Sequence, residues 1–84
     1  MSTDEAILSL RAYVERGRPT GGFIHAVLCN DLMAAVSRAD ESSLANLGDI
    51  CRYVYNRMPA ASWGSPEKVT AWVVRHCERR EVAS

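Results

Sequence analysis

Two side chains with catalytic or metal-binding chemistry, His25 and Cys29, stand four residues apart. On a helix this spacing places both on one face, where they would form half of a metal site or a base beside a thiol nucleophile. Either site needs further ligands, and the other His–Cys association is the adjacent pair His76-Cys77, whose side chains point about 100° apart on a helix. The chain also has no phosphate-binding loop, HExxH pair or nucleophile elbow. We therefore predict no enzyme, no catalytic residue, no metal and no cofactor.

Two loops rich in small residues precede predicted helices, and both have the composition of an anion-binding helix start: Thr20-Gly21-Gly22 and Ser62-Trp63-Gly64-Ser65. Free backbone N–H groups and the helix dipole attract anions there, and glycine lets a phosphate approach the backbone. Arg18 lies beside the first loop, and the Trp63 ring is suited to stacking on a nucleobase. If the loops meet, within one chain or across a subunit interface, they form a pocket for a phosphate and a base. The candidate ligand-binding residues are Arg18, Thr20, Gly21, Gly22, His25, Trp63 and Ser65.

The same residues also have a purely structural interpretation, which the sequence leaves open. Gly21-Gly22 is a common turn pair, and Ser65-Pro66 is a common helix start with Ser as the cap. Trp63 would then only close the end of a helical bundle.

Four segments show apolar residues at helical spacing, separated by Gly, Pro and Ser. The first helix is predicted to begin at a Ser2 or Thr3 cap and to end at Gly17, since glycine favours the left-handed residue that closes many helices. The second is predicted over residues 23–36, with the poor helix formers Asn30-Asp31 inside it. Its apolar positions cover a wide face, which is typical of a helix in the middle of a bundle.

The third helix is predicted to begin within residues 40–43 and to end at Met58, because Pro59 disfavours helical geometry in the residue before it. The fourth is predicted to begin at the Ser65 cap with Pro66 in its first position. No segment alternates with a period of two, so no sheet is expected. The sequence predicts an all-α fold, a compact bundle of four helices.

The chain has 84 residues, of which 48% are hydrophobic and 24% charged. This composition is that of a globular protein, and we expect one helical domain over residues 1–84 with frayed ends at 1–3 and 80–84. The start of the chain carries no basic segment followed by an apolar one, no apolar run is long enough for a membrane span, and the three cysteines form no disulfide framework. A cytoplasmic location with reduced thiols is the expectation.

Ten Lys and Arg balance ten Asp and Glu, so the formal net charge is zero. Broad binding to nucleic acid or anionic membrane needs a basic surplus, which argues against both. Nine of the ten basic residues are Arg. The bias fits either the coding preference of a GC-rich genome or a surface built for bidentate recognition of phosphate or carboxylate.

Three stretches of the chain resemble a family of short, mostly uncharacterised proteins of tailed phages and prophages: GGFIHAVLCNDL at residues 21–32, YVYNRMP at 53–59 and WGSPEKVTAW at 63–72. The resemblance covers about residues 7–75. It implies a phage-type origin rather than an activity, and its relatives carry polar residues at the position of Cys29, which argues against essential thiol chemistry. Small phage proteins of this kind often act by stoichiometric binding to counter host defence.

Three functions follow from these observations. The leading expectation is an oligomeric anti-defence protein that sequesters a nucleotide-like anionic signal at the two loops. The alternative is an inhibitor or adaptor that blocks a host defence protein by direct contact, since Tyr, Trp and Arg dominate interface hot spots. A DNA-binding regulator is the weaker third possibility.

Overall fold

The structure is a computed structural model that describes residues 1–83, with side chains described up to Cys77. Its elements are all helical: α1 (Thr3–Arg16), α2 (Gly22–Leu28), α3 (Leu32–Arg38), α4 (Glu41–Ala45), α5 (Leu47–Arg57), the 3₁₀ turn η1 (Ala60–Ser62) and α6 (Pro66–Ala83). The all-α prediction is confirmed. The prediction of four helices is wrong, because the described residues form six α-helices.

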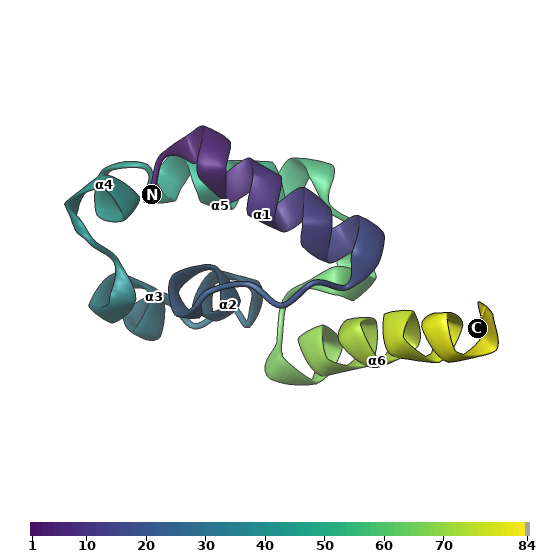
Figure 1. The fold of residues 1–84 in the computed structure, drawn as a ribbon. Coiled ribbons are helices and arrows are strands. Elements are labelled where there is room, and N and C mark those ends of the chain that lie inside the picture. Colours follow the sequence, from purple (N-terminus) through teal and green to yellow (C-terminus); the bar gives the residue numbers. More distant parts are fainter. Residues whose placement is uncertain (84) are drawn as a thin grey trace.

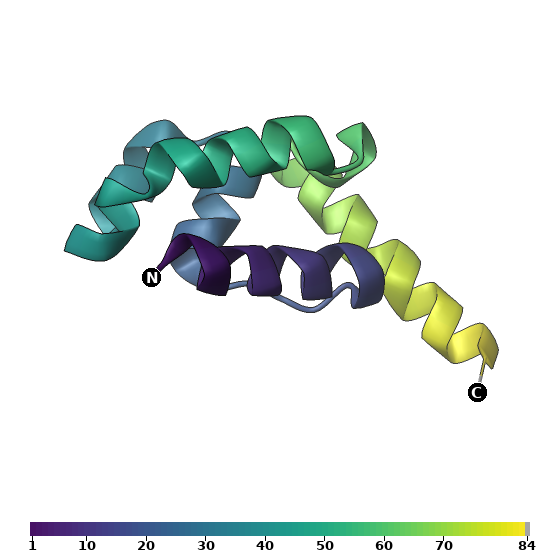
Figure 2. The same cartoon turned by 90° about the horizontal axis from the view of Figure 1, so that it is seen from above.

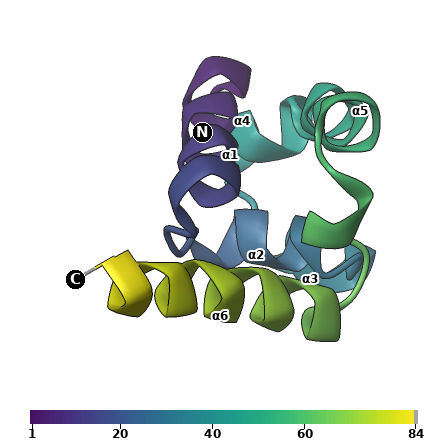
Figure 3. The same cartoon turned by 90° about the vertical axis from the view of Figure 1, so that its right-hand side faces the viewer.

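The helices lie in two layers (Figures 1 and 3). One layer holds α1 beside α5, with α4 at its edge, and the other holds α2, α3 and α6. In the view from above, α6 runs diagonally past the end of α1, and its last turns project beyond the other helices (Figure 2). The C-terminal end of α1 therefore lies at the junction of the two layers.

The second predicted helix breaks into α2 and α3 at Asn30, which adopts the left-handed conformation with φ 61°. The Asn30 N–H donates to the Val27 carbonyl at 3.0 Å, and the Asp31 N–H donates to the Ala26 carbonyl at 2.9 Å. These two bonds are the Schellman pattern that closes a helix, with asparagine in the place usually taken by glycine. The Asp31 side chain then accepts from the Ala34 N–H at 3.1 Å and starts α3.

The third predicted helix is interrupted at Asn46, which ends α4 and begins α5. The interruption is slight, because the Asn46 N–H still bonds the Ser42 carbonyl and the Ile50 N–H bonds the Asn46 carbonyl. The Asp40 side chain caps α4 by accepting from the Ser43 N–H at 2.7 Å. The predicted start within residues 40–43 and end at Met58 are both confirmed.

The first helix begins and ends as predicted. Ser2 and Glu5 form a reciprocal capping box at its start, and Gly17 closes it with φ 66°. The Gly17 N–H donates to the Tyr13 carbonyl at 2.9 Å. These contacts fix both ends of α1 by purely local interactions.

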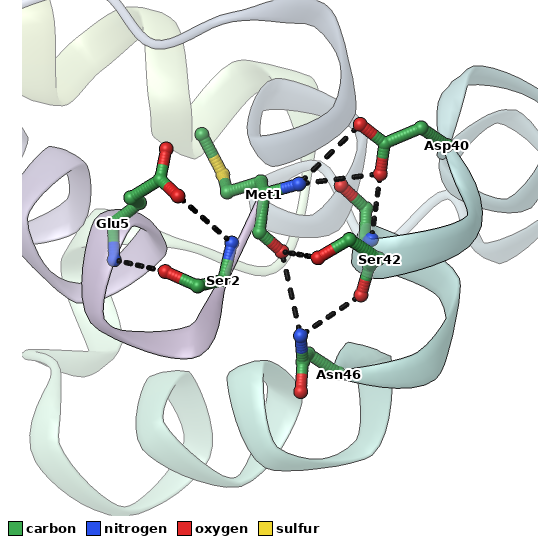
Figure 4. A network of polar contacts seen from close by, with 7 residues as sticks. Met1, Ser2, Glu5, Asp40, Ser42 and Asn46 are labelled. Atoms are coloured by element: carbon green, nitrogen blue, oxygen red, sulfur yellow. Dashed lines mark hydrogen bonds and ion pairs between the residues drawn. The ribbon is translucent and has the colours of Figure 1, made fainter.

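The first residue of the chain is held against α4 (Figure 4). The Met1 ammonium lies 3.2 and 3.3 Å from the two Asp40 carboxylate oxygens, and the Met1 carbonyl accepts from Ser42 Oγ at 3.1 Å and from Asn46 Nδ2 at 3.5 Å. Hydrogen bonds from Ser43 and then from the Met1 ammonium lower the pKa of Asp40 to about 2. Residues 1–3, where fraying was expected, thus contribute contacts, whereas α6 extends to Ala83 and Ser84 lies outside the described residues.

The core joins α1 to α2, α5 and α6. Its buried members are Ala6, Leu10, Tyr13, Ile24, Leu28, Ile50, Val54, Met58 and Val69. Tyr13 also anchors the chain leading into α6, since its hydroxyl donates to the Ser62 carbonyl at 2.7 Å. Trp72 Nε1 donates to the Tyr13 carbonyl at 3.2 Å, so Tyr13 ties the end of α1 both to η1 and to α6.

Candidate functional site

The two loops predicted to form one anion pocket lie at opposite ends of α2. Gly22 is the first residue of α2, whereas the Gly64 N–H donates to the Leu28 carbonyl, at the last residue of α2, with a distance of 2.7 Å. A helix of seven residues is about 10 Å long. Within one chain, the described residues therefore do not join the loops in a single pocket.

The start of α2 is covered by an arginine, but it is not Arg18. Arg38, at the end of α3, directs its Nη1 toward the Gly22 carbonyl at 3.5 Å. A Cβ on Gly22 would lie only 3.3 Å from Arg38 Cδ. Arg18 and Gly21 are exposed and line none of the described cavities. Sequence reasoning missed Arg38 because it lies sixteen residues away from Gly22 and belongs to a separate helix.

The second loop closes the other end of α2. The Trp63 ring is partly buried and lies 6.1 Å from the Tyr55 ring, at an interplanar angle of 58°. Its Nε1 is buried and has no hydrogen-bond partner among the described residues. Ser65 Oγ accepts from the Lys68 N–H at 3.2 Å, as the predicted cap of α6. These contacts agree with the structural interpretation of the loop, in which Ser65 caps a helix and Trp63 closes the end of the bundle.

Thr20 and His25 are the two candidate residues that share a cavity. They line one side of a cleft of about 250 Å³ whose other side is α6, and Tyr13 and Val69 are its buried members. Trp63 instead lines a separate hollow of about 200 Å³ with Asn30 and Tyr55. The structure thus divides the predicted site residues between two places.

His25 and Cys29 do lie on one face of α2, with His25 Nε2 and Cys29 Sγ 3.5 Å apart. Burial, and then the negative charges of Asp31 and Glu67, raise the pKa of the Cys29 thiol. The nucleophile is the thiolate, so a raised pKa makes this cysteine a poor one at neutral pH. Among the described residues, no three His, Cys, Asp or Glu side chains gather to hold a metal ion.

Helix α3 carries the feature that sequence reasoning missed. Leu32, Met33 and Val36 are 62%, 75% and 41% exposed, whereas the small side chain of Ala35 is 1% exposed. The prediction that residues 23–36 form one central helix placed Leu32 and Val36 inside the bundle and is wrong there, because the turn at Asn30 changes the direction of the chain. The available signal was the pair Asn30-Asp31, a left-handed closing residue followed by a helix cap.

The three exposed side chains of α3 form one surface, which we call the α3 face: Leu32, Met33 and Val36. Val36 follows Leu32 by four residues and Met33 by three, so all three side chains lie next to one another on the helix. In an ordinary surface helix the large apolar side chains face the core and the polar ones face water. In α3 the large apolar side chains are exposed together with the polar ones, and the buried position is taken by the small Ala35.

Comparison of the chain with protein-family models, with curated proteins and with solved structures finds no match. Over the residues that the structure describes, no helix combines the length and the apolar character needed to cross a membrane.

Proposed function

We propose that this protein acts by stoichiometric binding to another protein through the α3 face. The observation that supports this most directly is the orientation of α3, which exposes Leu32 and Met33 and buries only Ala35. Exposed apolar surface is unfavourable in water, and full burial of a Leu, Met or Val side chain is worth about 1.5–3 kcal/mol. Burying the exposed part of the α3 face against a partner would therefore contribute on the order of 4 kcal/mol.

The size and shape of the α3 face suit a groove on a folded protein. Two turns of helix that present neighbouring apolar side chains are the common ligand of a hydrophobic groove, and the flexible Met33 side chain adapts to such a surface. Leu44 adds a further exposed apolar residue on α4, the next helix along the chain. The resemblance to phage proteins makes a host defence protein the proposed partner.

The geometry favours protein contact over sequestration of a nucleotide-like signal. Sequestration relied on two loops that lie at opposite ends of α2. The cleft that does contain Thr20 and His25 has no Arg or Lys among its lining residues to neutralise a phosphate. A site shared between subunits would be needed to reunite the loops.

The test uses host strains that each carry one defence system, infected by phage while the protein is expressed. We expect the wild-type chain to restore plaque formation in at least one strain and L32E/M33E to lose that effect. Leu8→Glu is the matched control, because Leu8 is also an exposed leucine, 68% exposed, but lies on α1. Isothermal titration of the purified defence protein should then show saturable binding that only L32E/M33E weakens.

Two outcomes would overturn the proposal. Full activity of L32E/M33E would remove the α3 face from the mechanism. Micromolar binding of a cyclic nucleotide or an ADP-ribose derivative that Arg18→Ala abolishes would support sequestration instead.

Light scattering on the wild type and L32E/M33E shows whether the α3 face binds a second copy of the chain. In that case the wild type is oligomeric and the double variant is monomeric.

A further inference from the structure

The cleft between the α1–α2 loop and α6 has the shape of a small-molecule site. Its volume is about 250 Å³, and an apolar cavity of roughly 150 Å³ is enough to hold benzene. Tyr13 and Val69 are its buried members, while Val73 and Val74 form the α6 side. A compound with one or two rings fits this space.

The lining residues determine the chemistry of the ligand. No Asp, Glu, Lys or Arg lines the cleft. Tyr13 is only 1% exposed and its hydroxyl already donates to the Ser62 carbonyl, so Tyr13 forms the buried floor of the cleft and offers no free polar group. Thr20, Thr70 and His25 provide polar groups at the more exposed positions. A charged ligand would lose its hydration here without meeting a permanent counter-charge, whereas an uncharged ligand with a hydroxyl or an N–H group loses far less hydration free energy and can bond the polar rim.

The walls of the cleft are fixed by contacts that do not depend on a ligand. Trp72 Nε1 holds α6 to the Tyr13 carbonyl at 3.2 Å. Gly17 approaches His76 so closely that a Cβ on the glycine would lie 2.5 Å from His76 Cβ. A preformed site binds more tightly than one that must be ordered on binding, because less conformational entropy is lost.

We infer that this cleft binds a small, uncharged, largely apolar molecule that carries one or two hydrogen-bonding groups, of the size and chemistry of indole or a substituted phenol. The site is separate from the α3 face and does not rest on the function proposed for that face. Its ligand packs against Pro19 and the valines of α6, above the buried Tyr13, and the threonines at the rim bond its polar group.

The experiment is an NMR titration of the full chain with indole as the probe, following the methyl groups of Val73 and Val74. We expect saturable shifts with a Kd below about 1 mM. Val74→Trp places a large side chain at the cleft and should weaken indole binding by about tenfold or more. Leu8→Trp is the control, because Leu8 is also an exposed apolar residue, 68% exposed, but lies on α1 away from the cleft lining.

A second variant and a second ligand complete the test. Thr70→Tyr, at an exposed position on the same rim, should block the cleft as Val74→Trp does, and thus serves if Val74→Trp fails to fold. Indole-3-carboxylate, which adds one negative charge to the probe, should bind about tenfold more weakly than indole. The inference fails if indole gives no saturable shifts at millimolar concentration, if folded cleft variants bind it as the wild type does, or if the carboxylate binds equally well.

Discussion

Helices α1 and α3 use similar apolar residues in opposite ways. α1 turns Ala6, Leu10 and Tyr13 into the core, so that Leu10 has no exposed surface, whereas α3 turns only Ala35 inward and leaves Leu32 largely exposed. The end of α1 is also tied to η1 and to α6 by one hydrogen bond each, and Gly17 lies close to the His76 side chain. The difference indicates that α1 has an inward apolar face that holds the fold together, while the large apolar residues of α3 are available to a partner.

Shortening one leucine on each helix tests this difference directly. Leu10→Ala should lower the free energy of unfolding by about 2–5 kcal/mol, because it removes buried methyl groups and leaves a cavity. Leu32→Ala should change it by less than about 0.5 kcal/mol, because Leu32 is already exposed to water. Urea denaturation followed by circular dichroism measures both. Equal losses would mean that α3 contributes to the core as α1 does.

The junction of α1 with α6 can be tested through Gly17. Gly17→Ala should cost about 2–4 kcal/mol, because φ 66° strains any residue with a Cβ and because that Cβ would meet His76. Gly48→Ala is the control: Gly48 lies inside α5 with open space around it, so alanine there should stabilise the helix by about 0.5–1 kcal/mol. Thermal unfolding of the two variants separates them, and a neutral Gly17→Ala would show that α6 does not pack tightly on α1.

The Tyr13 hydroxyl should contribute less to the free energy of unfolding than the Leu10 side chain or the packing at Gly17. Tyr13→Phe leaves the buried Ser62 carbonyl without its partner and should cost about 1–2 kcal/mol at neutral pH. Tyr55→Phe, at an exposed position, should cost almost nothing.

The loss of stability in Tyr13→Phe should also depend on pH. Burial, and then the nearby Cys29, raise the pKa of Tyr13 from 10.0 to about 12. The stabilisation of the fold by the Tyr13 hydroxyl is therefore complete below pH 10. It is lost as the pH rises toward 12, because the unfolded chain releases the Tyr13 proton more readily than the folded chain. The stability difference between the wild type and Tyr13→Phe should narrow over that range in denaturation curves. A constant difference would contradict the buried hydroxyl bond.

Sequence patterns predicted the elements that local chemistry determines. The cap at the start of α1, its closure at Gly17, the stop at Met58 and the Ser65 cap of α6 all depend on residues within one or two turns of each other. The break at Asn30 also has a local cause, but a long apolar pattern on both sides concealed it.

The sites depended on contacts that the sequence does not encode locally. Arg38 reaches Gly22 from another helix. Thr20 lines one cleft with Thr70 and Val74 only because α6 packs across the end of α1. Periodicity gives the faces of a helix but not which neighbour each face meets. For that reason the α3 face and the cleft emerged only from the three-dimensional arrangement.

The contact between Met1 and Asp40 has a practical consequence for handling the protein. A tag fused ahead of Met1, or acetylation of its amino group, turns the ammonium into a neutral amide and removes the ion pair with Asp40. The bonds from Ser42 and Asn46 to the Met1 carbonyl need no charge and can persist. Because Met1 lies against α4, the helix that follows α3 in the chain, an amino-terminal tag would also add foreign residues beside α4, and an untagged chain is the better reagent for binding experiments.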